Sequence, residues 1–306
     1  SATDAYNTAV GNNAGINVTT GIHNTLIGGL AGDAITVGHR NVAVGKDALT
    51  ANVGGAKNIA IGEGALSTFN SGSSVSDTYN TTVGHFAGGS VTTGTVNTFV
   101  GGLAGDGTDD GGGNAALGFS ALSGNCGDDN SAVGSYTLFQ TTGTKNTAIG
   151  QTAGYGITSG NNNICIGADA GRTGSPGGNQ TTGSNSICLG DENIGDAYIQ
   201  VDWTIASDQR DKTDFTALDL GLDFVKALAP VTYKWDKRSK YGDKSAEDYD
   251  LLSQTPDGTH KEDWLDIGFK AQEVEALEIA AGYNKDNKTN LVSSHTGDGK
   301  QMGLQY

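Results

Sequence analysis

The chain has 306 residues, including 49 glycines, 18 Lys and Arg, and 34 Asp and Glu, which give a formal net charge of -16. This excess of acid argues against binding to the phosphate backbone of nucleic acids. No stretch reaches the roughly 18 consecutive apolar residues of a membrane-spanning helix, so we expect no membrane insertion. The glycines do not recur as Gly-X-Y triplets, which excludes collagen. Three cysteines at irregular spacing predict neither a disulfide framework nor a zinc site, and we expect no cofactor and no metal.

Composition divides the chain near residue 200. Residues 1–200 contain 41 of the 49 glycines, 5 of the 18 Lys and Arg, and none of the three tryptophans. The remainder carries all three tryptophans, more charge and runs of residues with helical periodicity. We therefore predict two domains, one over residues 1–196 and one over residues 197–306.

A repeat of about 17 residues fills the first domain. Its pattern is Asn, any residue, a small residue, an aliphatic residue, Gly, any two residues and Ala. Ten of the eleven repeats keep the Asn four residues before the central glycine, and nine keep the Ala. The central glycines are Gly11, Gly28, Gly45, Gly62, Gly84, Gly101, Gly118, Gly134, Gly150, Gly167 and Gly190.

This pattern predicts a parallel β-solenoid in which each repeat forms one coil. The residue before every central glycine is Val, Ile or Leu, and these types favour strands. The recurrent glycines would each cost a helix about 1 kcal/mol. Equivalent residues then stack one strand spacing apart, so eleven coils predict a rod of about 50 Å. We expect the aliphatic column, which includes Val44 and Val100, to be buried, and the asparagines to bond buried backbone groups or one another.

Two of the repeats, Asn41–Leu49 and Asn58–Leu66, resemble the head repeats of trimeric autotransporter adhesins and repeats of phage tail fibres. The resemblance covers about residues 5–195 and implies a left-handed parallel β-roll with three chains side by side. A single thin coil buries little apolar surface, which also favours partners beside it. The predicted fold is mainly β: a trimeric β-roll or β-solenoid, followed by a small α+β domain.

Two features inside the repeats have a chemical and a simpler interpretation. Cys165 and Cys188 stand in the column that holds alanine in other repeats, which predicts small buried side chains. Segment 105–113 is rich in Gly and Asp and faintly resembles calcium-binding glycine-aspartate repeats, but it occurs once, so a solvated loop is the preferred interpretation.

Two insertions, residues 67–79 and 172–184, lengthen the repeat that contains them. Loops that project from a rigid solenoid commonly carry binding functions. Phe69, Tyr79 and Phe86 could stack on sugars there, although ordinary loop packing is the simpler interpretation.

The second domain shows alternating strands and helices. The pattern predicts a strand over 199–205, a helix over 218–229 that Pro230 ends, a strand over 231–235, a helix over 270–281 and a hairpin over 290–306.

Five segments of this domain stand in the order found in the C-terminal intramolecular chaperone of phage endosialidases, tailspikes and long tail fibres. They are Ser207–Lys212, Gly221–Val231, Tyr233–Trp235, Ile267–Val274 and Gly303–Tyr306. The resemblance covers about residues 200–306 and implies a domain that trimerises the fibre and then cuts itself off. In that family a long helix follows the closing Tyr, so we expect the chaperone here to stop short of its final helix.

The resemblance also implies the chemistry of the cut. Cleavage would fall between Ala206 and Ser207, with Ser207 as the nucleophile and Lys212 as the general base. A lysine that acts as a base must be neutral, which requires burial or nearby cations. Asp208 and Arg210 match the motif as well, and their role as turn formers, trimer contacts or oxyanion support stays open. The expected activity is a single self-cleavage by a serine endopeptidase, without activity on other substrates.

The preferred functional hypothesis is a homotrimeric tail-fibre or spike segment of a phage, or of a phage-like injection device. Its expected partners are a host-surface glycan or protein and other tail or baseplate proteins, and its expected place is the virion tail, after assembly in the host cytoplasm. Two alternatives remain: a tailspike that depolymerises polysaccharide, and a bacterial trimeric surface adhesin. The first is weakened because the repeats offer few acids for the paired carboxylates that glycan cleavage needs.

Overall fold

The computed structural model describes residues 5–194, 210, 213, 220–243, 248–283, 293–295 and 302–304. The chain divides into two compact units, Ser1–Asp191 and Glu192–Tyr306. Among the described residues, no helix has both the length and the apolar character needed to cross a membrane.

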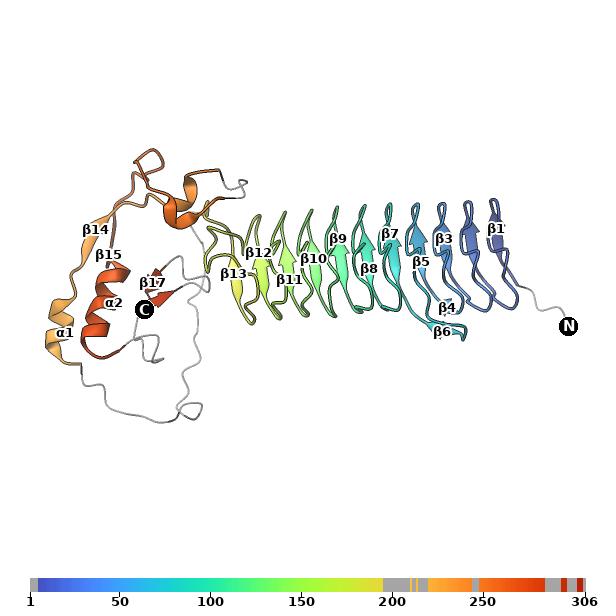
Figure 1. Cartoon of the computed structure of the whole chain (residues 1–306), viewed down its shortest axis with the longest axis horizontal. Helices are drawn as coiled ribbons and strands as arrows, with labels where there is room; N and C mark the ends of the chain where they lie inside the picture. The colour runs from blue at the N-terminus through green and yellow to red at the C-terminus, as the bar shows by residue number, and fades with distance from the viewer. Residues whose placement is uncertain are drawn as a thin grey trace. The chain divides into compact units, whose positions relative to one another are not determined.

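The first unit is a parallel β-solenoid, which confirms the predicted fold class. Figure 1 shows its short strands side by side in chain order, and they form one eleven-stranded parallel sheet. Neighbouring strands are in register, so that Ala43 pairs with Ala60 and Cys165 with Cys188. The strands are β1 (Thr8–Val10), β2 (Thr25–Ile27), β3 (Val42–Val44), β5 (Ile59–Ile61), β7 (Thr81–Val83), β8 (Thr98–Val100), β9 (Ala115–Leu117), β10 (Ser131–Val133), β11 (Thr147–Ile149), β12 (Ile164–Ile166) and β13 (Ile187–Leu189).

The aliphatic column is not buried within a single chain. From β2 to β13 the central residue of each strand, such as Ala43 or Phe99, is the buried one. The residue before the glycine is exposed or half-buried, and Val44 and Val100 belong to the half-buried group. The physical reason is that side chains alternate across a strand, so in a three-residue strand the first and last residues share the face opposite to the middle one.

The predicted asparagine ladder is present, and it is buried from Asn24 to Asn163. The backbone N–H of each Asn donates to the Oδ1 of the Asn one coil earlier, at 3.0 Å from Asn41 to Asn24 and 3.0 Å from Asn58 to Asn41. Side-chain Nδ2 atoms reach glycine carbonyls on the next coil, as from Asn41 to Gly55 at 2.9 Å. The ladder therefore satisfies backbone groups at the corner where each coil enters its strand, and buried polar groups need such partners.

The central glycine is required by both conformation and space. Gly28 has a φ of +133°, and a Cβ built on it would lie 2.4 Å from the carbonyl oxygen of Gly45 on the next coil. The following residue, Gly29, has no positive φ, and a Cβ built on it would have no neighbour within 4 Å. Close stacking of the corners thus explains why only one glycine of this pair recurs in the repeat.

The cores of several coils are filled by one of two complementary arrangements. Phe99 in a strand centre is accommodated by Gly105, where a Cβ would come within 2.5 Å of the ring. Where the centre is a small residue such as Ala43, the equivalent position holds Leu49, which is fully buried at a φ of 55°. The left-handed backbone costs a non-glycine residue about 1–2 kcal/mol, and burying the leucine side chain offsets it with about 1.5–3 kcal/mol.

The insertion at residues 67–79 is partly packed into the solenoid. Its β6 (Ser76–Asp77) pairs in parallel with β4 (Gly55–Ala56). Phe69, which the sequence offered as a sugar platform, is fully buried in the core. Tyr79 and Phe86 are exposed, as a binding role would require.

The second unit contains two short sheets and two α-helices. Strand β14 (Val231–Tyr233) pairs antiparallel with β15 (Asp266–Gly268), and β16 (Ser293–His295) pairs antiparallel with β17 (Met302–Leu304). The helices are α1 (Leu222–Ala227) and α2 (Ala271–Ala280), and two 3-10 turns cover Arg238–Lys240 and Leu251–Ser253. The predicted strand at 231–235, the helix at 270–281 and the hairpin are thus confirmed.

Two predicted elements of the second unit are not confirmed as predicted. The strand at 199–205 lies outside the described residues. The helix at 218–229 is shorter than predicted, and none of the residues of α1 is buried. Leu228 is already extended, which is consistent with the steric demand that Pro230 makes on the chain before it.

Candidate functional site

The predicted cleavage site falls mostly outside the described residues. Ala206, Ser207, Asp208 and Lys212 are not among them, so their roles stay predictions. Arg210 is described, and its side chain is exposed.

The other motif segments of the second unit meet in space. Strand β14, which ends at the Tyr of the Tyr-Lys-Trp segment, pairs with β15, which opens the segment that continues into α2. An apolar cleft lies between the end of α1 and α2, with Ala227 and Leu228 on one side and Phe269, Val274 and Leu277 on the other. Three motifs that are distant in the sequence therefore build one small α+β layer.

This layer exposes large apolar side chains. Trp264 and Ile267 are 76% and 79% exposed. Trp264 lies just before β15, and Ile267 lies within it. Leu222 and Val225 on α1 are also exposed. Large apolar side chains that stay exposed are candidates for contact with another protein surface when they lie together.

The solenoid presents a second apolar surface along its sheet, which we call the aliphatic column. It consists of the residues before the central glycines: Val10, Ile27, Val44, Ile61, Val83, Val100, Leu117, Val133, Ile149, Ile166 and Leu189. Leu117, Val133 and Ile149 are 53%, 43% and 45% exposed on three successive coils. Their in-register pairing makes the exposed aliphatic surface continuous from coil to coil.

Sequence reasoning found this column but did not determine which side of the sheet it faces. The signal that places it correctly is the middle position of the strand, which is small in most repeats because it faces the narrow interior of the coil. Period-two alternation then puts the aliphatic residue outside.

An aromatic ladder joins three coils near the end of the solenoid. Phe119, Tyr136, Phe139 and Tyr155 contact in sequence, with ring centroids 5.4, 5.5 and 5.1 Å apart. The guanidinium of Arg172 lies 5.2 Å from the centroid of Tyr155. Because Phe139 and Tyr155 stack on each other and Arg172 covers Tyr155, these ring faces are used inside the chain, and the ladder ties the coils together.

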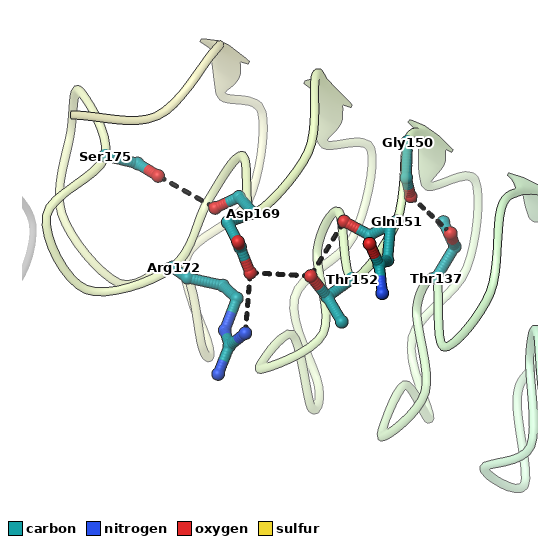
Figure 2. Close-up of polar contacts among 7 residues, drawn as sticks. All are labelled: Thr137, Gly150, Gln151, Thr152, Asp169, Arg172 and Ser175. Carbon is teal, nitrogen blue, oxygen red and sulfur yellow. Dashed lines mark hydrogen bonds and ion pairs between the residues drawn. The ribbon is translucent and has the colours of Figure 1, made fainter. Parts of the chain in front are cut away.

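Polar contacts also link the coils at this end of the solenoid (Figure 2). Asp169 accepts hydrogen bonds from the Thr152 hydroxyl on the preceding coil and from Arg172, both at 2.6 Å. Ser175 donates to the backbone carbonyl of Asp169 at 2.9 Å. Asp169 thus holds Arg172 in place over Tyr155 and fixes the start of the second insertion.

The cysteines are buried, and their thiols are expected to be unreactive. Burial raises the pKa of Cys165 to about 12, and the neighbouring Cys188 contributes in the same direction. Burial also raises the pKa of Cys188, although a hydrogen bond from the Gly171 N–H opposes the effect. Thiols with raised pKa values hold little reactive thiolate at neutral pH, so the interpretation as small core residues is confirmed.

Comparison with known families adds one finding. Residues 207–283 match the family described as chaperone of endosialidase, and the matched segment begins at Ser207. This supports the chaperone part of the sequence interpretation. No curated protein matches the chain, and no solved structure does.

Proposed function

We propose that this chain is a segment of a homotrimeric tail fibre or spike from a phage or a phage-like injection device. In this proposal the solenoid contacts the host surface, binding a glycan or a protein, and other tail or baseplate proteins hold it in the virion. The chaperone drives trimerisation and then cleaves the chain before Ser207. The family match to residues 207–283 implies self-association, and the exposed aliphatic column carries the proposal.

The column favours association of identical chains along their length. Each coil contributes one Val, Ile or Leu, so a second chain in the same orientation meets an apolar partner at every step. Full burial of such a side chain contributes about 1.5–3 kcal/mol. A closed ring of three chains presents every column to the shared axis and leaves none exposed, which is how symmetric oligomers limit their growth.

Light scattering of the full-length protein at micromolar concentration tests the trimer. The expected mass before cleavage is three times the 31.1 kDa of this chain if the assay uses the same residues. Ile149→Asp in the column should lower the mass, whereas Gln151→Asp, at an exposed position of the same coil, should not. A wild-type monomer that melts cooperatively would contradict the proposal.

The proposed cleavage is an internal acyl transfer followed by hydrolysis. The Ser207 hydroxyl attacks the carbonyl carbon of Ala206, and neutral Lys212 takes the hydroxyl proton. The peptide C–N bond breaks and an ester forms, with the amino group of Ser207 freed. Water then hydrolyses the ester. If this geometry forms only in the trimer, cleavage reports assembly and makes unfolding of the fibre irreversible, which is a kinetic form of stability.

Mass spectrometry of freshly folded full-length protein tests this step. Wild type should yield a fragment that ends at Ala206, and Ser207→Ala and Lys212→Ala should remain whole. Lys226→Ala on α1 is a control that should cleave normally. An intact wild-type chain in a fully formed trimer would show that Ser207 and Lys212 have only structural roles.

A further inference from the structure

One corner of the solenoid concentrates positive charge in an otherwise acidic unit. The residue before each ladder asparagine lies in a single column, and in the first five repeats this column reads Tyr6, His23, Arg40, Lys57 and Tyr79. We call these five residues the cationic corner. Residues 1–200 hold only 5 Lys and Arg against 14 Asp and Glu, so two cations and a histidine on successive coils stand out.

The backbone holds these side chains in line. All five residues have left-handed φ values between 48° and 63°. The N–H of Arg40 donates to the carbonyl of Ile22 at 3.0 Å, and that of Lys57 donates to His39 at 3.0 Å, one coil apart each time. Equivalent residues therefore stand about 4.8 Å apart along the rod, the spacing of adjacent strands.

The polar groups of the corner are available to a ligand to different degrees. Arg40 is exposed and makes no ion pair within the part of the solenoid that the structure describes. Lys57 is held by Asp77 at 2.6 Å and by the Tyr79 hydroxyl at 2.8 Å, and it lies 4.8 Å from the Tyr79 ring centroid. Tyr6 stacks on His23 with ring centroids 5.5 Å apart. Tyr6 and Tyr79 nevertheless remain 70% and 50% exposed.

We propose that the cationic corner binds an acidic polysaccharide whose chain runs along the rod. Arg40 offers a planar fork that matches a sugar carboxylate. Lys57 lies one coil further, and its ammonium group would contact the glycan while it remains paired with Asp77. Tyr6 and Tyr79 provide exposed aromatic side chains at the two ends, suited to the apolar faces of sugars. Only a few cations are aligned and the whole chain carries a charge of -16, so a carboxylate-bearing glycan fits better than a nucleic acid with its dense phosphates. The inference rests on the proposed host attachment and names its ligand class and face.

Alginate oligomers, which carry a carboxylate on every sugar, are a suitable probe for the full-length protein. Fluorescence anisotropy should show binding to labelled alginate, no binding to neutral dextran, and affinity that falls as salt rises from about 0.05 to 0.5 M because the charges are exposed. The double variant Arg40→Gln/Lys57→Gln should bind about tenfold or more weakly, since charge-assisted hydrogen bonds contribute about 1.5–3 kcal/mol each.

Lys145→Gln is the matched control. Lys145 occupies the same column, is exposed and has a φ of 59°, but its neighbour one coil earlier is Asp129. It should bind alginate as wild type does. Equal weakening by Lys145→Gln, binding of single-stranded DNA as tight as alginate, or no binding of alginate by wild type would each overturn the proposal.

The outcome is separable from that of the proposed function. The corner lies within one chain, so binding can be measured whatever the oligomeric state. A trimer by light scattering that ignores alginate would remove this inference and leave the fibre proposal standing. A monomer that binds alginate through Arg40 and Lys57 would remove the fibre proposal and leave this inference standing.

Discussion

The solenoid and the C-terminal unit differ in how each uses its apolar residues. In the solenoid every coil from β2 onward has a buried strand centre, and the same positions are filled again in each repeat. In the C-terminal unit, α1 buries no residue, and only Val274 and Glu278 of α2 are buried. Trp264 and Ile267 are mostly exposed to solvent.

The difference shows which surfaces are complete within one chain. A solenoid coil needs only its two neighbours to fill its core, because the contacts of repeat proteins are local. Its aliphatic column and the C-terminal apolar residues lie outside such cores. These two sets of residues are where substitutions should affect association, whereas substitutions at the strand centres should affect folding.

The largest effect is expected from a charge placed in a strand centre. Ala148→Asp puts a carboxylate at a fully buried position with no partner, which should cost about 3–5 kcal/mol of the free energy of unfolding. Ile149→Asp, the next residue, points to the exposed face and should leave the stability of a dissociated chain nearly unchanged while weakening association. Denaturant unfolding combined with light scattering measures both. Similar losses of chain stability in the two variants would break the distinction between inner and outer columns.

A methyl group at a coil corner should have an intermediate effect. Gly28→Ala forces a residue with a side chain to a φ of +133° and brings its Cβ within 2.4 Å of the Gly45 oxygen, which should cost about 2–4 kcal/mol. Gly29→Ala has open space and should change stability by less than about 1 kcal/mol in either direction. Thermal unfolding of the two variants compares them directly. Equal melting temperatures would mean that the corners are not stacked closely.

The smallest effect near neutral pH is expected from a buried thiol, whose influence on stability begins only at high pH. The pKa of Cys165 in the folded chain is raised to about 12, above the ordinary value of about 8.5 in an unfolded chain. Between these values the unfolded state gives up a proton that the folded state retains. Wild-type stability should therefore fall as pH rises through this window, by up to about 1.4 kcal/mol per pH unit from this group.

Cys165→Ala tests this, because alanine occupies the same column at Ala148. Its stability relative to wild type should improve steadily from about pH 9 upward. Thr147→Ala on the adjacent strand carries no titratable group and should keep the wild-type slope. A Cys165→Ala variant with the unchanged alkaline slope would show that the thiol ionises in the folded state.

Much of the solenoid was predictable from the sequence because its information is local and repeated. The spacing of the central glycines predicted one coil per repeat, and the asparagine column predicted the internal ladder. The alanine column predicted that Cys165 and Cys188 are buried. In the second unit the hairpin and α2 followed from turn residues and helical periodicity. The cleavage residues Ser207 and Lys212 came from family resemblance, since their spacing alone carries no chemistry, and they remain predictions.

The sequence by itself determined the number of coils, their register and the class of fold, because period and residue type constrain a backbone directly. Only the tertiary structure decided which side of the sheet each column faces, because three-residue strands are too short for alternation to be recognised by composition. It also decided that Gly105 makes room for Phe99 and that Leu49 fills the space beside Ala43. Such pairing depends on volumes that meet across a coil, and it placed Tyr6, His23, Arg40, Lys57 and Tyr79 on one corner through hydrogen bonds between coils.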